Sequence, residues 1–492
     1  MSLASLLAGL TPVVAPDIEI ADLTLDSRGM REGMAFIALP GTRTHGVGFA
    51  SQAAAAGARA ILWEPVAGVT PPHIPGNVPL VGVPDLTRIL GAIADRFFAA
   101  PSRDVRVVGV TGTNGKTTTA HLIAAATHAL GESSAYAGTL GYGRIEALRT
   151  GTHTTPDSIT LHRQIAELRD EGVRILGMEV SSHALDQHRV DGVRFDSAVF
   201  TNLTRDHLDY HGTFEAYGAA KAKLFAWPGL RHAVINADDP FARSLLGAAA
   251  HATVVAFSRA PLPAHAGHRA LFARRVVMAG HGLQIDVDGS WGAATLRSRL
   301  IGAFNVENLL AALATLLGWE IALPRAIEAL EHCTAPPGRM ETLSAPGRAL
   351  AIVDYAHTPD ALEKALLAAR AHCAGTLTCV FVCGGDRDPG KRALMGAIAE
   401  RLADRVILTD DNPRSESGDA IVADIVAGLS RPQDVRIERD RARAIALALA
   451  DGAAGDAVLI AGKGHEDYQI VGAERRHFSD REVALAALGR QP

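Results

Sequence analysis

The chain has 492 residues, of which 48% are hydrophobic and 21% charged. This is ordinary usage for globular proteins and excludes a mostly disordered chain. The length exceeds that of one compact core, and a prior of about 150 residues per domain predicts three domains. The formal net charge of -5 creates no global field that would attract nucleic acid or an anionic membrane. We therefore expect neither nucleic-acid binding nor membrane insertion.

The cysteines and the N-terminal segment indicate the compartment. Four cysteines in so long a chain do not form a disulfide scaffold, so we expect reduced thiols. The first basic residue is Arg28, so the N-terminus lacks the charged region of a signal peptide. The uncharged stretch 117–131 is too short to span a bilayer. We expect a cytoplasmic protein.

The first hundred residues mix short strands with alanine-rich helices. The pattern predicts strands over 34–39 and 60–63 and helices over 49–56 and 86–99. The second helix ends before Pro101, which we interpret as a domain boundary.

A different pattern starts at residue 105. Residues 105–110 form a short apolar run, followed by a glycine-containing turn and an apolar helix over 117–130. Further strands are predicted over 173–180 and 195–200. Residues 335–338 (Ala-Pro-Pro-Gly) then break the helical pattern and predict a second linker.

The last third alternates strands with helices rich in Ala and Leu, which predicts an α/β fold with a parallel sheet and right-handed crossovers. The predicted strands are 351–353, 377–382, 406–408, 435–438 and 458–461. In such sheets, ligands bind outside the carboxyl ends of the strands. Four segments that follow strands are dense in charge and glycine, and therefore predict a site there: 354–360, 384–388, 410–414 and 462–466.

The strongest local motif is Thr111-Gly-Thr-Asn-Gly-Lys-Thr-Thr118, between a predicted strand and a predicted helix. Glycines let such a turn wrap an anion, so that backbone N–H groups and the helix N-terminus face phosphates. Lys116 would neutralise the β- and γ-phosphates, and the Thr117 hydroxyl would reach Mg²⁺. The general pattern has glycine where this chain has Val110. The motif predicts ATP binding.

Three further residues are candidates whose local pattern leaves two interpretations open. Glu179 ends an apolar strand, where it could hold a nucleotide-bound metal or cap the next helix. His207 lies in a loop with a second His and two Asp, and is either a metal ligand or a structural histidine. Lys221 lies in a helical segment, where a lysine is ordinarily solvated.

The order of these motifs resembles that of the Mur ligase family, over nearly the whole chain. Besides the phosphate loop, the resemblance rests on Glu-Val-Ser-Ser-His (179–183), the stretch 201–212, Gly-Ala-Phe-Asn-Val-Glu-Asn (302–308), Pro-Gly-Arg-Met-Glu (337–341) and the stretch 354–360. Four more segments are similar to family members that add meso-2,6-diaminopimelate: 153–157, 187–189, 411–414 and 462–467.

The resemblance implies three domains. These are an N-terminal UDP-substrate-binding domain (1–101), a central ATP-binding domain built on a parallel sheet with the phosphate loop (102–336), and a C-terminal Rossmann-like amino-acid-binding domain (337–492).

The resemblance also implies roles for individual residues. ATP would be bound by Gly112, Thr113, Asn114, Gly115, Lys116, Thr117, Thr118, Asn305 and Arg339. The UDP-linked substrate would be bound by Leu25, Ser27, Thr42, Arg43, Thr44, His153, Thr154, Thr155, Ser181, Gln187 and Arg189. Diaminopimelate would be bound by Arg387, Asp411, Asn412, Pro413, Arg414, Gly462 and Glu466. Mg²⁺ would be held by Thr117, Glu179, His207 and Lys221, the last as a carbamate (N6-carboxylysine).

The choice of amino acid is expected to depend on Arg414. A guanidinium fork matches a second carboxylate bidentately, and diaminopimelate has that carboxylate where lysine lacks it. The alternative is that Arg414 pairs with a neighbouring acid, Asp410, Asp411 or Glu416.

The activity implied by the resemblance is ATP-dependent amide formation through an acyl phosphate. Its substrates would be UDP-N-acetylmuramoyl-L-alanyl-D-glutamate and meso-2,6-diaminopimelate, in peptidoglycan precursor synthesis, and we expect a monomer. A lysine-adding relative and a folylpolyglutamate-synthase-like ligase remain alternatives within this class. A phosphotransferase with the same loop and a nucleotide-regulated binding protein are alternatives outside it.

Overall fold

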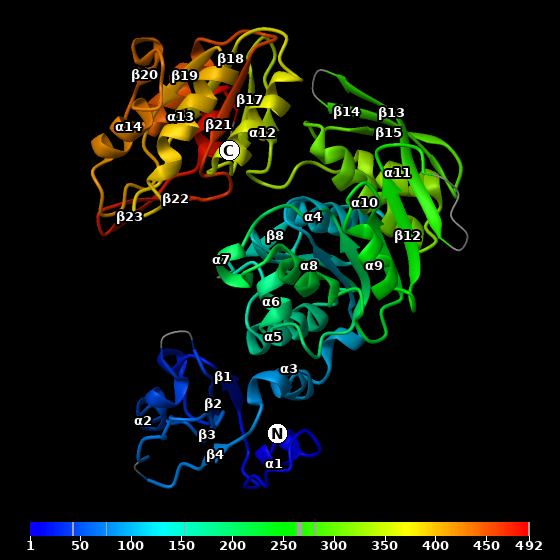
Figure 1. Ribbon diagram of the computed structural model, residues 1–492, viewed down its shortest axis with the longest axis vertical. Helices are drawn as coiled ribbons and strands as arrows, with labels where there is room; N and C mark the ends of the chain where they lie inside the picture. Colours follow the sequence, from blue (N-terminus) through cyan, green and yellow to red (C-terminus); the bar gives the residue numbers. More distant parts are fainter. Residues whose placement is uncertain (42–43, 75, 152, 263–267, 280–281, 491–492) are drawn as a thin grey trace. The chain divides into compact units, whose positions relative to one another are not determined.

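The computed structural model describes residues 1–41, 44–74, 76–151, 153–262, 268–279 and 282–490. It divides into two compact units, which are described separately below. The first unit contains residues 1–116, 131–235 and 239–254, and the second contains residues 117–130, 236–238 and 255–492. Figure 1 labels many of the helices and strands of both.

The first unit begins with a four-stranded parallel sheet in the order β1-β2-β3-β4. All five residues of β2 are buried, as expected for a strand covered on both faces. The strands are β1 (Asp22–Thr24), β2 (Met34–Ala38), β3 (Ala60–Trp63) and β4 (Leu80–Gly82). The helices are α1 (Leu3–Leu7), α2 (Ala50–Ala55), α3 (Leu86–Phe97), and the 3₁₀ turns η1 (Ser27–Gly29), η2 (Gly46–Phe49) and η3 (Pro101–Arg103).

The remainder of the first unit is built on strands in the order β11-β10-β5-β9-β6-β7-β8. The central strand β5 is parallel to both β9 and β10, which brings their carboxyl ends to one edge. The strands are β5 (Arg106–Thr111), β6 (Ser134–Gly138), β7 (Gly141–Arg144), β8 (Ala147–Arg149), β9 (Ile175–Glu179), β10 (Phe195–Phe200) and β11 (His232–Asn236). The helices are α5 (Ser158–Asp170), α6 (Ser182–Asp186), α7 (Leu208–His211), α8 (Phe214–Ala222) and α9 (Ala242–Ala248).

The second unit contains the helix that follows the phosphate loop, an antiparallel ribbon and the C-terminal sheet. The antiparallel strands β13, β14 and β15 pair in sequence order. This part comprises α4 (Lys116–Ala129), β12 (Thr253–Ser258), β13 (Arg269–Ala279), β14 (Gly282–Gly289), β15 (Ala294–Ser298), α10 (Phe304–Gly318) and α11 (Leu323–Glu331).

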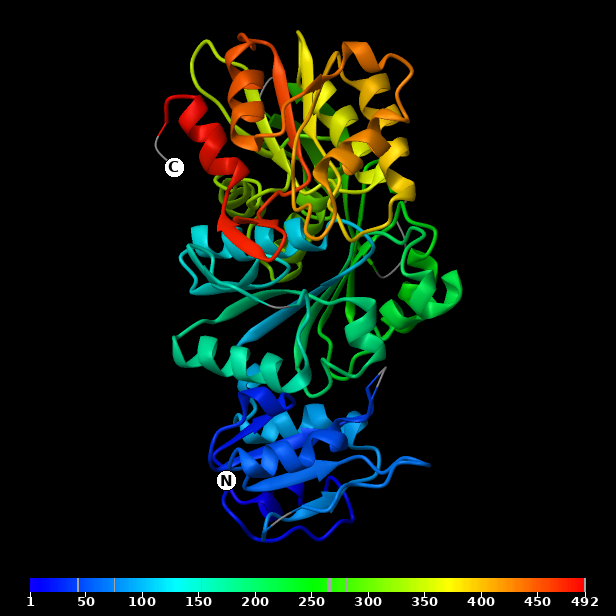
Figure 2. The same ribbon diagram turned by 90° about the vertical axis from the view of Figure 1, so that its left-hand side faces the viewer.

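The C-terminal sheet has the order β16-β17-β21-β18-β19-β20, and all its pairs except β16–β17 are parallel. Figure 2 shows helices on both faces of this sheet, where two hydrophobic cores lie. Its elements are β16 (Glu341–Leu343), β17 (Leu350–Asp354), α12 (Pro359–Arg370), β18 (Leu377–Phe381), α13 (Gly390–Leu402), β19 (Arg405–Leu408), α14 (Gly418–Val426), η4 (Pro432–Asp434), β20 (Arg436–Ile437), α15 (Arg441–Ala450), β21 (Ala457–Ala461), the hairpin β22 (Tyr468–Val471) and β23 (Glu474–His477), and α16 (Asp480–Ala487).

The predicted α/β class and the parallel C-terminal sheet are confirmed. The sequence did not predict the ribbon β13–β15 or the hairpin β22–β23. No helix among the described residues is long and apolar enough to cross a membrane. All four cysteines are free thiols, as predicted.

Candidate active site

The loop between β5 and α4 is braced by the segment that follows β10. Gly112 has φ +150°, and a Cβ at this position would lie 2.0 Å from Thr201 Oγ1, so only glycine fits. Thr201 Oγ1 donates to the carbonyl of Asn114 (2.6 Å), and the backbone N–H of Asn114 donates to Asn202 Oδ1 (3.0 Å). The loop is therefore held in a fixed shape by two neighbouring parallel strands.

Two ammonium groups share one carbonyl of this loop. Lys116 Nζ donates to the carbonyls of Gly112 and Thr113, both at 2.9 Å. Lys221 Nζ donates to the same Gly112 carbonyl, also at 2.9 Å. The Lys221 side chain is buried, with 1% of its surface exposed, so the interpretation of a solvated surface lysine is wrong. Burial, and then the charge of Lys116, lower the pKa of Lys221 well below its ordinary value.

Tyr217 joins Lys221 to the loop and was not predicted from the sequence. Its ring centroid lies 4.4 Å from Lys221 Nζ, and its hydroxyl lies 3.2 Å from Thr113 Oγ1. Burial raises the pKa of Tyr217 to about 12, so the phenol stays neutral. A signal did exist: Tyr217 precedes Lys221 by four residues, which places both on one face of α8.

Three histidines cluster beside Tyr217. The ring of His183 lies 4.8 Å from that of His207 and 5.4 Å from that of His211, and the His207 ring lies 6.0 Å from Tyr217. Burial lowers the pKa of His183 and of His211, and the neighbouring His207 lowers both further. The candidate metal ligand His207 and the predicted Lys221 thus contact the same tyrosine ring.

Glu179 is buried at the carboxyl end of β9. Its carboxylate accepts hydrogen bonds from the hydroxyl of Tyr136, the backbone N–H of Thr139 (2.9 Å) and the Thr139 hydroxyl (3.3 Å). The next helix, α6, is capped by Ser181, whose Oγ accepts from the N–H of Ala184. The interpretation of Glu179 as the cap of that helix is therefore wrong.

The residues predicted for the dipeptide form one hydrogen-bonded network. Thr155 Oγ1 donates to the carbonyl of Glu179 (2.9 Å) and accepts from the N–H of Ser181 (3.2 Å). Arg189 donates to the carbonyl of Thr155 (3.1 Å) and to Gln187 Oε1 (2.9 Å). Burial lowers the pKa of Arg189. A second bond links Thr139 to predicted Thr154 (3.1 Å), while predicted His153 lies in the bend before α5.

The residues predicted for the uridine end line a cavity of about 680 Å³. Leu25 and Ser27, which follow β1, and Thr44, which follows β2, contribute to its wall, and Arg163 contributes from α5. Arg163 also donates to the carbonyl of Leu23 (2.8 Å). The predicted residues Thr42 and Arg43 lie outside the described residues.

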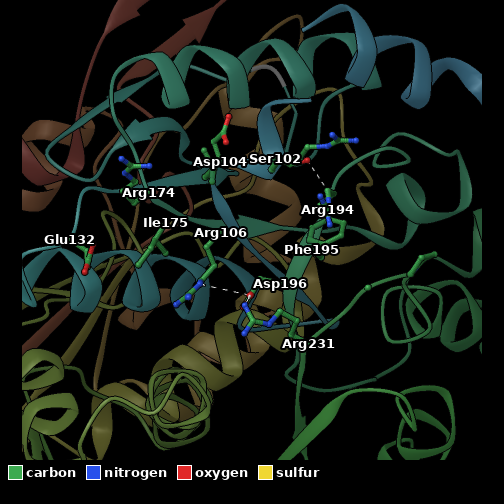
Figure 3. Close-up of a pocket in the computed structure, with 14 residues that line it drawn as sticks. Ser102, Asp104, Arg106, Glu132, Arg174, Ile175, Arg194, Phe195, Asp196 and Arg231 are labelled. Atoms are coloured by element: carbon green, nitrogen blue, oxygen red, sulfur yellow. Dashed lines mark hydrogen bonds and ion pairs between the residues drawn. The ribbon is translucent and has the colours of Figure 1, made fainter. Parts of the chain in front are cut away.

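A different cavity, of about 590 Å³, opens at the amino ends of β5, β9 and β10. It is lined by five arginines and three acids, among which Asp196 bonds Arg231 (3.4 Å) and lies 3.8 Å from Arg106. Figure 3 shows both arginines directed toward Asp196. None of the predicted site residues lines this cavity, consistent with ligand sites at the opposite, carboxyl edge of such sheets.

In the second unit, the predicted nucleotide residues are partly or fully buried. Thr117 and Thr118 lie in the first turn of α4. The amide of Asn305 is 1% exposed, donates to the carbonyl of Ile301 (2.7 Å) and accepts from Asn308 (2.8 Å). Asn308 in turn accepts from Thr119 on α4 (3.2 Å), so Asn305 supports the helix that follows the phosphate loop.

Arg339 is held over an aromatic ring. Its guanidinium carbon lies 5.0 Å from the ring centroid of Tyr355. Its Nε is buried and makes no hydrogen bond with the residues that the structure describes. A buried donor without a partner is costly, which suits a group that meets a ligand.

Arg414 pairs with none of the acids considered above. Its guanidinium donates to the carbonyl of Gly385 (2.6 Å). Asp410 pairs with Arg439 instead, and Glu416 pairs with Arg392. Across the described residues Arg414 makes no ion pair, so the alternative interpretation is wrong and its charge is available to a ligand.

The loop that carries Arg387 is fastened to the loop that carries Arg414. The Asp386 carboxylate accepts from the Ser415 hydroxyl (2.5 Å) and from its N–H (3.3 Å). The exposed Arg387 follows Asp386 directly. Predicted Gly462 has φ +121°, a conformation suited to glycine. The structure therefore brings the predicted amino-acid residues to one edge of the C-terminal sheet.

Lys463 is a further residue that sequence reasoning missed. It is fully buried and lies between Asp411, Asn412 and Glu466, three of the predicted residues. No local pattern distinguished it, because a lysine between two glycines ordinarily indicates an exposed turn.

Left-handed backbone conformations are concentrated at the predicted residues. Nine described non-glycine residues have φ between 49° and 66°. Five of them are predicted site residues or lie next to one: His188, His207, Met340, Asp386 and Arg414. Such conformations cost about 1–3 kcal/mol each and cluster at functional sites. The strain is an independent indication that these loops bind ligands.

Comparison with known proteins accounts for this arrangement. Three family profiles match: the Mur ligase family, catalytic domain over 19–98, the Mur ligase middle domain over 110–316, and the Mur ligase, glutamate ligase domain over 338–464. The chain belongs to the Mur ligase family. The predicted Mur ligase fold, with its N-terminal, central and C-terminal domains, is thereby confirmed.

Two similar Mur ligases are named UDP-N-acetylmuramoyl-L-alanyl-D-glutamate--2,6-diaminopimelate ligase. The protein from Pseudomonas aeruginosa is 49% identical over 97% of each chain. The protein from Xanthomonas campestris pv. campestris is 50% identical over 99% of this chain and 98% of its own. A solved structure with the same name is 34% identical, covers 99% of both chains and superposes with a TM-score of 0.73.

Proposed function

We propose that this protein is an ATP-dependent ligase that adds meso-2,6-diaminopimelate to UDP-N-acetylmuramoyl-L-alanyl-D-glutamate in peptidoglycan precursor synthesis. The observation that carries the proposal is about half identity, over nearly the full length, to ligases named for these two substrates. The unpaired guanidinium of Arg414, at the predicted amino-acid site, supports the choice of a substrate with an extra carboxylate.

The phosphate loop would bind ATP. Its backbone from Gly112 to Gly115 is braced to receive an anion, and Lys116 would leave the loop carbonyls for the phosphates. Thr117 and Thr118 begin the helix whose N-terminus favours negative charge. Arg339, with its unsatisfied Nε, and Asn305 would complete the nucleotide site.

Mg²⁺ would be held by the hydroxyl of Thr117, the carboxylate of Glu179, His207 and a carbamate on Lys221. Only a neutral amine adds to CO₂, and burial, which lowers the pKa of Lys221, favours that form. The bound ion would act as a Lewis acid toward the phosphoryl oxygens. Carbamylation converts a buried cation into an anion beside the phosphate loop, which explains why a lysine occupies this position.

The reaction would proceed in two steps. The side-chain carboxylate of D-glutamate attacks the γ-phosphorus, forming an acyl phosphate and releasing ADP. An amine of diaminopimelate then attacks the acyl carbon, the amide bond forms and phosphate leaves. Lys116 stabilises the transferred phosphoryl charge, while the network around Thr155, Ser181, Gln187 and Arg189 holds the dipeptide in position.

The two ends of the substrates would be recognised by different regions. The uridine end would occupy the cavity lined by Leu25, Ser27 and Thr44. Diaminopimelate would be bound by Arg387, Asp411, Asn412, Pro413, Arg414, Gly462 and Glu466. The domains would be 1–101, 102–336 and 337–492, and the enzyme would act as a cytoplasmic monomer.

Mass spectrometry of the product formed with a panel of amino acids tests this proposal. The protein should consume ATP only when both the dipeptide and an amino acid are present, and should convert meso-diaminopimelate while almost ignoring L-lysine. A site that binds a polar group can reject an analogue lacking it by about 10⁴-fold. Comparable efficiency with lysine would refute the amino-acid assignment, and phosphorylated dipeptide without an amide would indicate a phosphotransferase.

A variant of Arg414, compared with a control variant in the same domain, tests whether this residue determines the choice of amino acid. Arg414→Ala should raise the KM for diaminopimelate strongly and leave the KM for ATP unchanged, because only one substrate meets that guanidinium. Arg443→Ala, an exposed arginine of the same domain paired with Glu438, is the control.

A further inference from the structure

The ammonium group of Lys463 is buried between two carboxylates. Its Nζ lies 3.2 Å from Asp411 Oδ1 and 3.5 Å from Glu466 Oε2, and a third oxygen, Asn412 Oδ1, lies at 3.5 Å. None of the Lys463 side chain is exposed, whereas 13% of Asp411 and 17% of Glu466 are. The cation is thus enclosed, and the two acids still reach solvent.

This arrangement leaves one oxygen of each acid unbonded. Asn412 Nδ2 and Lys463 both donate to Glu466 Oε2. No donor among the residues that the structure describes contacts Glu466 Oε1 or Asp411 Oδ2. Two carboxylates around one ammonium leave a surplus negative charge, and an ionised carboxylate accepts several hydrogen bonds. The unbonded oxygens therefore suit a cation that arrives from outside.

Strand β22 holds the Asp411–Asn412 segment through two hydrogen bonds. The backbone N–H of Ile470 donates to Asn412 Oδ1 (2.9 Å), and Gln469 Nε2 donates to the carbonyl of Asp411 (2.7 Å). The first bond fixes the side chain of Asn412 and the second the backbone of Asp411. Among the described residues, Lys463 is the donor that orients the Asp411 carboxylate, and it orients the Glu466 carboxylate together with Asn412.

Glu466 is the member of the cluster most sensitive to the loss of a neighbouring cation. Burial raises its pKa and the charge of Asp411 raises it further, while Lys463 and Asn412 lower it. The other ionisable groups that interact with Asp411 or Glu466 from the surrounding elements are Tyr355 and His357 after β17, Cys383 after β18, Arg441 on α15 and Tyr468 on β22. Lys463 is the nearest cation to Glu466, so its removal favours the protonated carboxyl.

A purely structural cross-link explains less of this geometry. One acid would satisfy a buried ammonium, and a second acid beside the first adds repulsion. Two acids are explained if Asp411 and Glu466 together bind a cationic ligand while Lys463 keeps both carboxylates ionised.

We propose that Lys463 is a positioning residue for the amino-acid substrate: it orients Asp411 and Glu466 so that their unbonded oxygens bind an ammonium group of a diamino acid. The inference rests on the proposed function and deepens its amino-acid site. Lys463 itself does not touch the substrate.

The test compares Lys463→Met with the wild type over a series of pH values. Methionine has a similar length and no charge, so Glu466 should remain protonated to higher pH. The KM for diaminopimelate should rise about tenfold at neutral pH, and the ratio of variant to wild-type KM should fall as the pH rises. The ratio cancels the titration of the substrate itself. The KM values for ATP and the dipeptide should not change.

Two further variants separate positioning from a structural role. Lys364→Met removes an exposed lysine of α12 and should behave as wild type. Lys463→Met combined with Glu466→Gln removes the titrating carboxyl, so the pH dependence of the KM ratio should disappear. A pH-independent KM ratio in Lys463→Met, or equal changes for all three substrates, overturns the proposal.

If Lys463→Met does not fold, Lys463→Arg provides the test, because it keeps the charge. It should retain the pH profile of the wild type, and a shifted profile overturns the proposal. Failure of the proposed function is a separate outcome, since the wild type would then form no diaminopimelate product.

Discussion

Lys221 and Arg441 are both buried cations, but only one of them lies against a carboxylate. Arg441 makes two bonds of 2.7 Å to Asp480, and neither side chain is exposed. Lys221 has a carbonyl and a tyrosine ring as partners. Burial would lower the pKa of both groups, and Asp480 more than compensates for it at Arg441, whose pKa is raised.

The presence or absence of a paired carboxylate distinguishes a buried charge that stabilises the fold from a buried group that can react. The guanidinium of Arg441 also donates to the carbonyl of Ala461 (3.1 Å), so it ties the end of β21 to α16 as a permanent ion. At Lys221, burial without a paired carboxylate lowers the pKa and so favours the neutral, nucleophilic amine. A buried cation without a counter-ion is therefore the better indication of a functional site.

The largest effect is expected on activity at Lys221. Lys221→Ala should lower kcat by about 100-fold or more, because the proposed metal ligand beside the transferred phosphoryl group would be lost. Short carboxylates added in solution should restore part of the rate, and Lys221→Glu should retain part. Lys223→Ala is the control, because Lys223 directly follows the same helix but is exposed and paired with Asp186. Equal rates in both variants would contradict the carbamate assignment.

Arg441 should show the opposite behaviour, with a large effect on stability. Arg441→Met leaves Asp480 buried and unpaired and should lower the free energy of unfolding by about 3–5 kcal/mol, measured by urea denaturation. The double variant Arg441→Met with Asp480→Leu should recover most of that loss, because no buried charge remains. A double variant as unstable as the single one would show that the ion pair is not the cause.

Stability should respond to pH through Lys221. Its folded-state pKa lies below the unfolded value, so the unfolded chain binds the extra proton between those two pKa values. Stability from this group therefore rises with pH across that window, which ends near the ordinary lysine pKa of about 10.4. Lys221→Met should be more stable than the unmodified wild type at neutral pH and should lack this rise. Denaturation in CO₂-free buffer at several pH values measures both, and an unchanged slope would contradict the prediction.

Tyr217→Phe should give a smaller change. It removes the bond to Thr113 Oγ1 but keeps the ring against Lys221. One hydrogen bond is worth about 1 kcal/mol, or about fivefold in the KM for ATP. A Tyr217→Leu variant, which also removes the ring, should have the larger effect on kcat; if both variants are equal, the ring contact is unimportant.

Most of the candidate site residues could be predicted because they lie in loops whose composition, rich in glycine and charge, is recognisable in the sequence. The phosphate loop and the segments that follow β17, β18, β19 and β21 stand out by glycine and charge at the ends of apolar runs. Topology places the four segments that follow strands of the C-terminal sheet at one edge of that sheet. The burial of Lys221 and Lys463 could not be predicted, because burial depends on residues far away in sequence, such as Gly112 for Lys221.

The hairpin β22–β23 was missed for a related reason. Its second strand reads Glu-Arg-Arg-His (474–477), all four residues are exposed, and no apolar alternation marks it as a strand. It forms because β22 docks on the Asp411–Arg414 loop through the bonds of Gln469 and Ile470. Long-range contacts of this kind leave no trace in a local pattern.

The left-handed residues suggest where the protein can be made more heat-resistant without loss of function. Ala99 and Ala100, with φ of 59° and 49°, belong to no predicted site. Glycine adopts this conformation without steric strain, although it also adds freedom to the unfolded chain. Ala100→Gly should therefore raise the melting temperature slightly, whereas Arg414→Gly would relieve strain only by removing the guanidinium that we propose binds the substrate. Positions with similar left-handed φ angles thus differ in whether glycine can replace them: the two alanines can be replaced, and Arg414 cannot be replaced without loss of its guanidinium.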